Sequence, residues 1–272
     1  MTLQARKTEK DEPMRLLEEI CRIAREAGAA ILPHYANPDL VALSKADASP
    51  VTAADHAAEA VIVAGLRRLT PDIPIVAEEM VAAGRVPDVS GGRFWLVDPR
   101  DGTKEFVKKI PEFTVNIALV EGSRPVLGVV YAPASDSLYA GAGPGTAFME
   151  IDGHGREPMA VRRMNPEAIT VALSRTYGSG TQLSHFLEHY RVKEQIQSGS
   201  SIKFCLVARG LADVYPRYGG SSEWDTAAGQ AVLEAAGGSV CEADSDRPLA
   251  YGKPRFGNPS FIAWGGRESG RA

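Results

Sequence analysis

Two aspartates stand three positions apart at the end of an apolar run, in the stretch WLVDPRDGTKEF at residues 95–106. Proline disfavours the α conformation in the residue before it, so Asp98 should stay extended, and Gly102 permits the tight turn that brings Asp101 back beside it. Two ionised carboxylates held this close repel each other unless a shared proton, an arginine or a metal cation compensates them. Arg100 lies between the two, so a salt bridge at the end of the strand is one interpretation.

Other acidic residues occupy similar boundaries. Glu78 and Glu79 follow another apolar run, and Asp225 begins an alanine-rich segment. Taken singly, the glutamates fit ordinary loop charges, and Asp225 fits a helix N-cap. Together, Glu78, Asp98, Asp101 and Asp225 offer four carboxylates, which suit Mg²⁺ and not a thiolate or imidazole zinc site.

Such a cluster is suited to phosphoryl transfer. Two Mg²⁺ ions about 3.5–4 Å apart can clamp both the attacking and the leaving oxygen. The turn after Asp101 also predicts the start of a short helix, whose free N–H groups at Gly102 and Thr103 would hold phosphate oxygens. The same applies at Thr226.

The elements that position these residues alternate along the chain. Apolar residues at three- and four-residue steps predict a helix over residues 14–32, and a second helix follows the turn in KADASPVTAAD. Further helices are expected in SIKFCLVARG and TAAGQAVLEAAGG, and GAGPG suits a hairpin better than a phosphate loop. The expected strands are IPIVAE, FWLVD, TVNIALVE, PVLGVVYAP, LYAGAG, TAFMEI, ITVALS, KEQIQ and ADVYP.

This order predicts an α+β part followed by an α/β part. We place the first domain at residues 1–160, with most of the predicted metal ligands. The second domain, residues 161–272, carries Asp225 and the residues expected to contact a nucleotide.

Composition excludes several classes of protein. The 272 residues are 44% hydrophobic and 24% charged, and 30 basic against 34 acidic residues give a net charge of −4. This balance does not indicate binding to nucleic acid polymers or to an anionic membrane surface. Three scattered cysteines, no apolar run long enough for a membrane span and a charged N-terminal stretch favour a cytoplasmic protein.

The motifs AEE, DPRDGTKEF and WDTAAGQAVLEAAGG occur in this order. The chain therefore resembles the Mg²⁺-dependent, lithium-sensitive phosphatases of the inositol monophosphatase and fructose-1,6-bisphosphatase superfamily, from KADASPVTAAD to about residue 240. The stretch from GSSIKFC to WDTAAGQ looks like the 3'(2'),5'-bisphosphate nucleotidase branch of the CysQ type. The resemblance implies a layered αβαβα sandwich and hydrolysis of 3'-phosphoadenosine 5'-phosphate to AMP and phosphate.

The resemblance also implies roles for individual residues. Glu78, Asp98, Asp101 and the backbone carbonyl of Arg100 would bind metal, Asp225 would bind a second ion, and the Arg100 side chain would point elsewhere. Asp55 would pair with Thr103 to orient and deprotonate the attacking water. Thr52 and Asp55 also fit a capping box at a helix start. Lys45 and Asp47 match a loop that approaches the metal site and can contribute to a third ion.

Substrate contacts are implied at three positions. Ser200, Lys203 and Arg217 match residues that face the nucleotide and its 5'-phosphate, and a substrate with two phosphates needs such partners. Alternatively, Lys203 decorates the outer face of a helix. Tyr177, in LSRTYGSGT, stands where the family often has a histidine near the adenine, and its ring could stack on a base.

Three functional hypotheses follow. The first is the bisphosphate nucleotidase, and the second is an inositol or sugar phosphatase of the same superfamily. The third is a non-catalytic Mg²⁺-dependent regulatory protein, although no expected ligand or activating residue is missing. The five histidines are scattered and form no zinc motif, and the chain has no P-loop.

Overall fold

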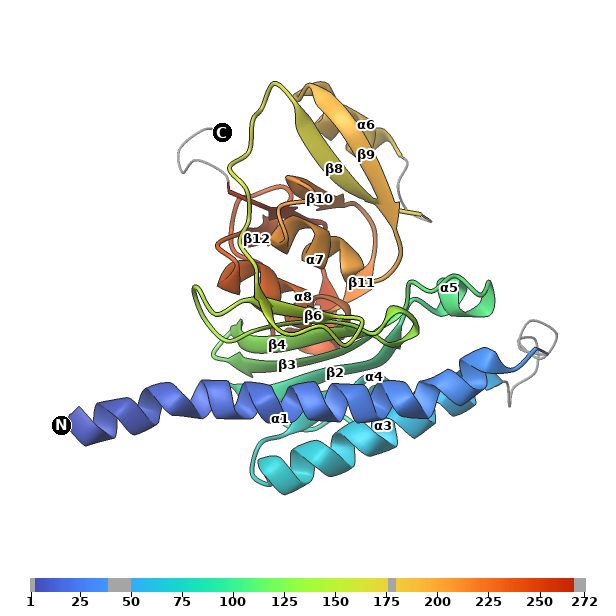
Figure 1. Ribbon diagram of the computed structural model, residues 1–272, viewed down its shortest axis with the longest axis vertical. Helices are drawn as coiled ribbons and strands as arrows, with labels where there is room; N and C mark the ends of the chain where they lie inside the picture. The colour runs from blue at the N-terminus through green and yellow to red at the C-terminus, as the bar shows by residue number, and fades with distance from the viewer. Residues whose placement is uncertain (1–2, 39–49, 176–179, 267–272) are drawn as a thin grey trace.

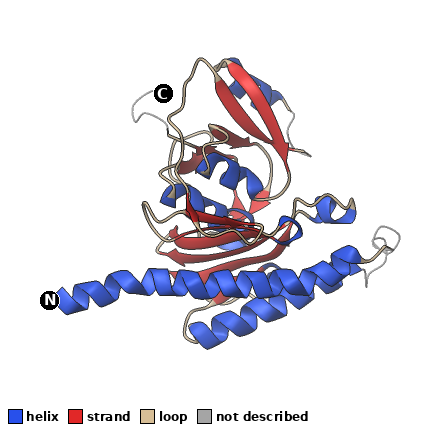
Figure 2. Cartoon of the chain, viewed as in Figure 1, coloured by secondary structure: helices blue, strands red, loops and turns tan. Residues whose placement is uncertain are grey.

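The computed structural model describes residues 3–38, 50–175 and 180–266. Helices and sheets alternate as layers (Figures 1 and 2). Helices α1 and α3 cover one face of a first sheet, α7 and α8 lie between this sheet and a second one, and α6 packs on the outer side of the second sheet. This is the layered αβαβα arrangement that the resemblance implied.

The first sheet has seven strands in chain order, β1 to β7. Strand β1 is parallel to β2, and the other neighbours are antiparallel, so the predicted hairpin between LYAGAG and TAFMEI is formed by β5 and β6. The elements of this part are α1 (Leu3–Ala36), α3 (Pro50–Leu69), β1 (Ile75–Ala77), α4 (Glu78–Ala82), β2 (Arg93–Asp101), α5 (Thr103–Val107), β3 (Thr114–Glu121), β4 (Arg124–Ala132), the 3-10 turn η1 (Pro133–Ser135), β5 (Ser137–Gly141), β6 (Phe148–Ile151) and β7 (Glu157–Pro158).

The second sheet has five strands in the order β12-β14-β10-β8-β9, and β11 pairs separately with β13. The elements of this part are β8 (Ile169–Ser174), α6 (Thr181–Glu188), β9 (Val192–Ser198), α7 (Ile202–Ala208), β10 (Val214–Arg217), β11 (Ser221–Ser222), α8 (Glu223–Ala235), β12 (Ser239–Glu242), the 3-10 turn η2 (Pro254–Phe256), β13 (Gly257–Asn258) and β14 (Phe261–Trp264). The first sheet thus comes from residues before 160 and the second from residues after it. In the part of the chain that the structure describes, no helix is long and apolar enough to cross a membrane.

The sequence of β2 is an apolar run because both faces of the strand are covered. Trp95 and Val97 pack with α1 and α3, whereas Phe94 and Leu96 pack with the layer of α7 and α8. Because successive side chains of a strand point to opposite faces, a sheet covered on both sides needs apolar residues throughout. The strand does not stop at Asp98, as FWLVD suggested, but continues to Asp101 across a shift of its pairing with β3.

Helix α8 belongs to the second half of the chain but packs on the first sheet. A Cβ atom on Gly128 of β4 would lie 2.8 Å from the carbonyl oxygen of Ala228, and one on Gly141 of β5 would lie 2.5 Å from the Cβ of Ala235. These distances are too short for any side chain larger than hydrogen, so glycines and alanines permit the close approach. The start of α8, where Asp225 lies, is thereby brought to the ends of the first sheet's strands.

Candidate active site

A single cavity gathers most of the residues singled out by the sequence. Its volume is about 280 Å³, and it lies between the end of β2 and the segments around α7, β10 and the start of α8. The predicted metal and substrate residues in the described parts of the chain all line it, namely Glu78, Asp98, Arg100, Asp101, Gly102, Thr103, Ser200, Lys203, Arg217 and Asp225. Asp55 is not part of this lining.

The register of β1 and β2 places two of the carboxylates side by side. The strands are parallel and pair Ala77 with Val97, so the next residues, Glu78 at the start of α4 and Asp98 within β2, lie next to each other. Their side chains share a hydrogen bond. Asp98 is buried, and its Oδ1 accepts the N–H of Arg100 at 2.9 Å.

Burial and mutual repulsion disfavour the charged forms of this acidic group. Burial, followed by the charges of Glu78, Asp101 and Asp225, raises the pKa of Asp98 well above its usual value. Burial, followed by the charge of Asp55, raises the pKa of Glu78 to about 7. Burial, followed by the charge of Asp101, raises the pKa of Asp225 to about 7. The cluster therefore holds protons unless a cation compensates it.

The donor set fits Mg²⁺ in its chemistry, because all the side-chain ligands are carboxylate oxygens. Among the residues described, however, no three His, Cys, Asp or Glu side chains already form a group that could hold an ion. One oxygen each of Asp98, Asp101 and Asp225 instead accepts a hydrogen bond from the protein. An ion would use the remaining oxygens together with carbonyl, water or phosphate oxygens, and Mg²⁺ commonly retains several waters.

The Arg100 side chain points toward Asp55 and not toward its aspartate neighbours. Its guanidinium is fully buried, with Nε 2.6 Å from Oδ1 of Asp55 and the second terminal nitrogen donating to Oδ2 at 2.7 Å. It also lies over the ring of Phe106, 4.4 Å from the centroid. The alternative salt bridge from Arg100 to Asp98 or Asp101 is therefore not formed.

Asp55 consequently faces Arg100 in this arrangement. No hydrogen bond joins Asp55 to Thr103 in the described structure, so their pairing stays a prediction. Burial raises the pKa of Asp55, and the charge of Arg100 opposes this rise. The capping-box interpretation is wrong, because α3 begins at Pro50 and Thr52 already lies inside the helix.

Gly102 turns the chain from β2 into α5. Its φ is +96°, which favours glycine, and a Cβ there would lie 2.9 Å from the carbonyl oxygen of Glu112. The predicted short helix forms and begins at Thr103. Thr103 is exposed at the cavity, next in space to the acidic group.

The loop that carries Ser200 contacts the acidic group directly. The Ser200 hydroxyl donates to Oδ2 of Asp101 at 2.7 Å, and its φ of +52° is unusual for a residue with a side chain. The Lys203 ammonium donates to the carbonyl oxygens of Ser198, at 3.2 Å, and of Ser200. Lys203 is 2% exposed, so it does not decorate an outer helix face, and burial lowers its pKa to about 8. Its expected contact with a phosphate stays a prediction.

Asp225 occupies the third position of α8 and not the N-cap. The N-cap is Ser222, whose N–H donates to Oδ2 of Asp225 at 2.9 Å in a capping box. The carboxylate thus reaches back across the first helical turn and lines the cavity. Arg217, at the end of β10, donates to the carbonyl oxygen of Gly220 at 3.0 Å and also lines the cavity.

The inositol monophosphatase family model matches residues 12–266 of the chain. The chain belongs to this family. The match spans both sheets and every residue of the cavity lining.

Relatives within this family carry more specific names. A 3'(2'),5'-bisphosphate nucleotidase CysQ from Salmonella typhimurium is 48% identical over 250 residues, which cover 90% of this chain and 98% of the relative. The crystal structure of CysQ from Bacteroides thetaiotaomicron superposes with a TM-score of 0.81 at 36% identity, covering 93% of this chain and 98% of that one. An inositol monophosphatase from Zymomonas mobilis superposes with a TM-score of 0.73 at 28% identity, covering 94% and 92%.

Sequence reasoning missed several residues in and around this cavity. Phe204, Tyr215 and Phe261 form an aromatic wall of the cavity, with ring centroids 5.2–5.6 Å apart. Thr114 and Ser201 join the Ser200 hydroxyl in a buried chain of hydrogen bonds. Polar residues at alternate positions of the apolar run TVNIALVE were the available signal for Thr114.

Three of the named residues lie outside the described parts of the chain: Lys45, Asp47 and Tyr177.

Proposed function

We propose that the protein is a Mg²⁺-dependent phosphomonoesterase that hydrolyses the 3'-phosphate of 3'-phosphoadenosine 5'-phosphate to AMP and phosphate. The observation that carries this proposal is a cavity lined by carboxylates together with cationic and aromatic side chains. The nucleotidase names of relatives 45–48% identical over nine-tenths of the chain support the choice of substrate.

Glu78, Asp98, Asp101, the Arg100 carbonyl and Asp225 would hold two or three Mg²⁺ ions. The bound ions would supply positive charge that favours ionisation of the attacking water and offsets charge on the leaving oxygen. Asp225 comes from the second half of the chain and the other ligands from the first, so a substrate phosphate would lie at the junction of the two halves.

Asp55 and Thr103 would prepare the nucleophile. In this role Thr103, at the cavity, holds the water, and Asp55 accepts the proton that the water loses through the threonine hydroxyl. The raised pKa of Asp55 makes it a better base than an exposed aspartate. The step requires the Asp55 carboxylate to turn from Arg100 toward Thr103.

The remaining parts of the substrate would lie against the second half of the chain. Arg217 and Lys203 provide positive charge for the 5'-phosphate, although Lys203 is already bonded to two carbonyls. Phe204, Tyr215 and Phe261 line the same cavity with aromatic rings that are almost fully buried. This combination favours a phosphorylated nucleotide over a polyol phosphate.

A phosphate-release assay tests the proposal. The substrates are 3'-phosphoadenosine 5'-phosphate, inositol 1-phosphate and fructose 1,6-bisphosphate, each with and without Mg²⁺ and Li⁺. We expect Mg²⁺-dependent, Li⁺-inhibited release that is fastest from the bisphosphonucleoside. Faster hydrolysis of inositol 1-phosphate would replace this proposal with the sugar phosphatase, whose fold is the same.

A further inference from the structure

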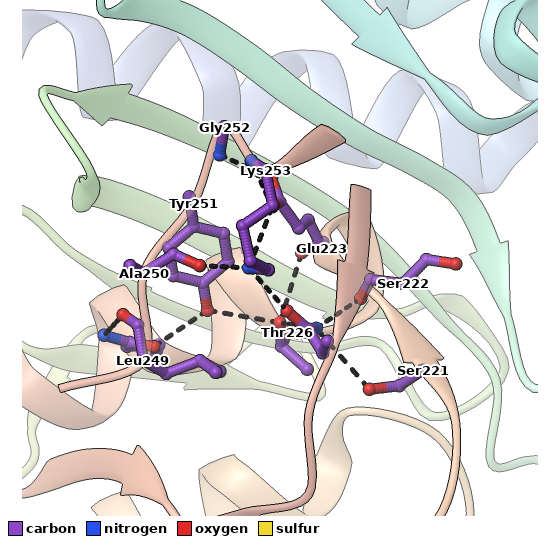
Figure 3. Close-up of polar contacts among 11 residues, drawn as sticks. Ser221, Ser222, Glu223, Thr226, Leu249, Ala250, Tyr251, Gly252 and Lys253 are labelled. Carbon is purple, nitrogen blue, oxygen red and sulfur yellow. Dashed lines mark hydrogen bonds and ion pairs between the residues drawn. The ribbon is translucent and has the colours of Figure 1, made fainter. Parts of the chain in front are cut away.

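A partly buried polar cluster ties residues 249–258 to the first turns of α8 (Figure 3). Its members are Glu223, Thr226, Gln230, Tyr251, Lys253 and Asn258. Of these, Thr226 lines the cavity, and the other five stand behind it. The mechanism above assigns none of these five a role.

Glu223 is the anchor of the cluster. Its side chain is fully buried at the first position of α8, two residues before Asp225. The carboxylate accepts the N–H groups of Gly252, at 2.8 Å, and Lys253, at 2.9 Å, and lies 2.8 Å from the Lys253 ammonium. A buried carboxylate needs such partners, so the loop at residues 252–253 is fixed to the start of the helix.

A second set of contacts reaches the two sides of Asp225. The Lys253 ammonium donates to Oδ1 of Asn258 at 3.2 Å. The Asn258 amide donates in turn to the Ser222 carbonyl at 2.8 Å and to the Thr226 hydroxyl at 2.9 Å. Ser222 is the N-cap that bonds Asp225, and Thr226 follows Asp225 directly, so the Asn258 amide bonds residues on both sides of Asp225.

The backbone of this segment is held in an unusual conformation. Arg255 and Phe256 have φ values of +67° and +53°, and β13 then pairs Asn258 with Ser221. Two successive non-glycine residues adopt positive φ only where surrounding contacts fix them. The contacts to Glu223 and Ser222 are such contacts, which indicates that the position of the segment is specified and not incidental.

We propose that Lys253 and Asn258 are positioning residues, which hold the first turn of α8 so that the Asp225 carboxylate faces the acidic group of the first half. The effect of these two residues on turnover rests on the proposed function. Asp225 must approach Asp98 and Asp101 across the boundary between the two sheets. If the first turn of α8 is rigid, the Asp225 carboxylate keeps one position relative to Asp98 and Asp101. If the turn is loosened, the carboxylate occupies several positions.

The test compares two variants by Mg²⁺ binding. Lys253→Met and Asn258→Ala are titrated calorimetrically with Mg²⁺ in the presence of inorganic phosphate, and kcat and KM are measured separately. Loss of an outer partner of a metal ligand costs roughly 10–100-fold in affinity or activity. We expect a loss of that size in Mg²⁺ affinity and in kcat at limiting Mg²⁺, with little change in KM for the nucleotide. Lys253→Arg should restore most of both.

Arg124→Met is the matched control. It removes the 2.8 Å ion pair to Glu234 at the other end of the same helix, and it should leave Mg²⁺ affinity unchanged. Parent-like Mg²⁺ affinity in Asn258→Ala, which keeps the Glu223–Lys253 pair, overturns the positioning role even if Lys253→Met does not fold. A parent protein that binds Mg²⁺ but releases no phosphate refutes only the proposed function, and one that binds no Mg²⁺ overturns both.

Discussion

The acidic side of the cavity lies at the ends of β1 and β2, and the basic side lies at α7 and β10. The charged side chains of the two sides have different partners. On the acidic side, Glu78 and Asp98 stand next to each other, and the nearest guanidinium, of Arg100, is paired with Asp55. On the basic side, Lys203 and Arg217 donate to carbonyl oxygens within their own loops. Like charges therefore accumulate on one side, whereas backbone dipoles partly neutralise the other.

This difference separates chemistry from specificity. The acidic side gains most from a bound cation, since a cation relieves the repulsion among its carboxylates while they stay ionised. We infer that the acidic side supplies the reaction that members of the family share, and that the basic side selects the substrate.

Asp98→Asn should give the largest effect, because it acts directly on the charge of the acidic side. It removes a buried carboxylate from the centre of the acidic group, and we expect kcat to fall by about 10²–10³-fold or more, as when a principal electrostatic group is lost. Asp88→Asn is a matched control, because Asp88 accepts the N–H of Ser90 at 2.9 Å as Asp98 accepts that of Arg100, but on an exposed loop. Near-parent turnover in Asp98→Asn would contradict a metal-ligand role.

The pH dependence of stability tests the accumulation of like charges on the acidic side. The pKa values of Glu78 and Asp225 are raised to about 7 from ordinary values of 4.5 and 3.8. At these two groups the metal-free folded protein therefore binds more protons than the unfolded chain, so the stability that they contribute is complete below about pH 4 and is lost as the pH rises through about 7.

The measurement is the midpoint of thermal or urea unfolding at about pH 5 and about pH 8. In EDTA, the free energy of unfolding should drop by about 5 kcal/mol, since each of the two groups titrates across about two pH units in this range and each unit corresponds to about 1.4 kcal/mol. Mg²⁺ should remove most of this drop, and Glu78→Gln should reduce it. A stability that increases toward pH 8 in EDTA would show that the carboxylates do not repel one another as inferred.

Arg217→Leu should affect the basic side alone and give the smallest effect. A hydrogen bond to a charged group contributes about 1.5–3 kcal/mol, so we expect KM for 3'-phosphoadenosine 5'-phosphate to rise by roughly 10–100-fold. Residual hydrolysis of inositol 1-phosphate should not change. Arg247→Leu, which breaks an exposed pair with Glu242, serves as the control. Equal losses on both substrates would refute the division of roles between the two sides.

Much of the acidic side could be predicted from the sequence because its determinants are local. Proline and glycine restrict only their own and adjacent residues, and these restrictions place Asp98 and Asp101 at the turn after an apolar strand. The short helix at Thr103 and the long helices follow from equally local patterns. The sequence could not show that β2 continues to Asp101, because that depends on pairing with β3.

The tertiary structure alone decided which distant residues meet. Arg100 pairs with a residue 45 positions away, and Ser200 bonds one that lies 99 positions away. Lys203 is buried because its helix packs between two sheets, although its neighbours in the sequence are equally compatible with a surface position. Motif residues and helix periodicity act within a few positions of the chain, and these determined the family and the carboxylates. Packing across the two sheets fixed the Asp55–Arg100 pair, the burial of Lys203 and the position of Asp225. Such contacts depend on every element between the partners, so they cannot be read from local sequence.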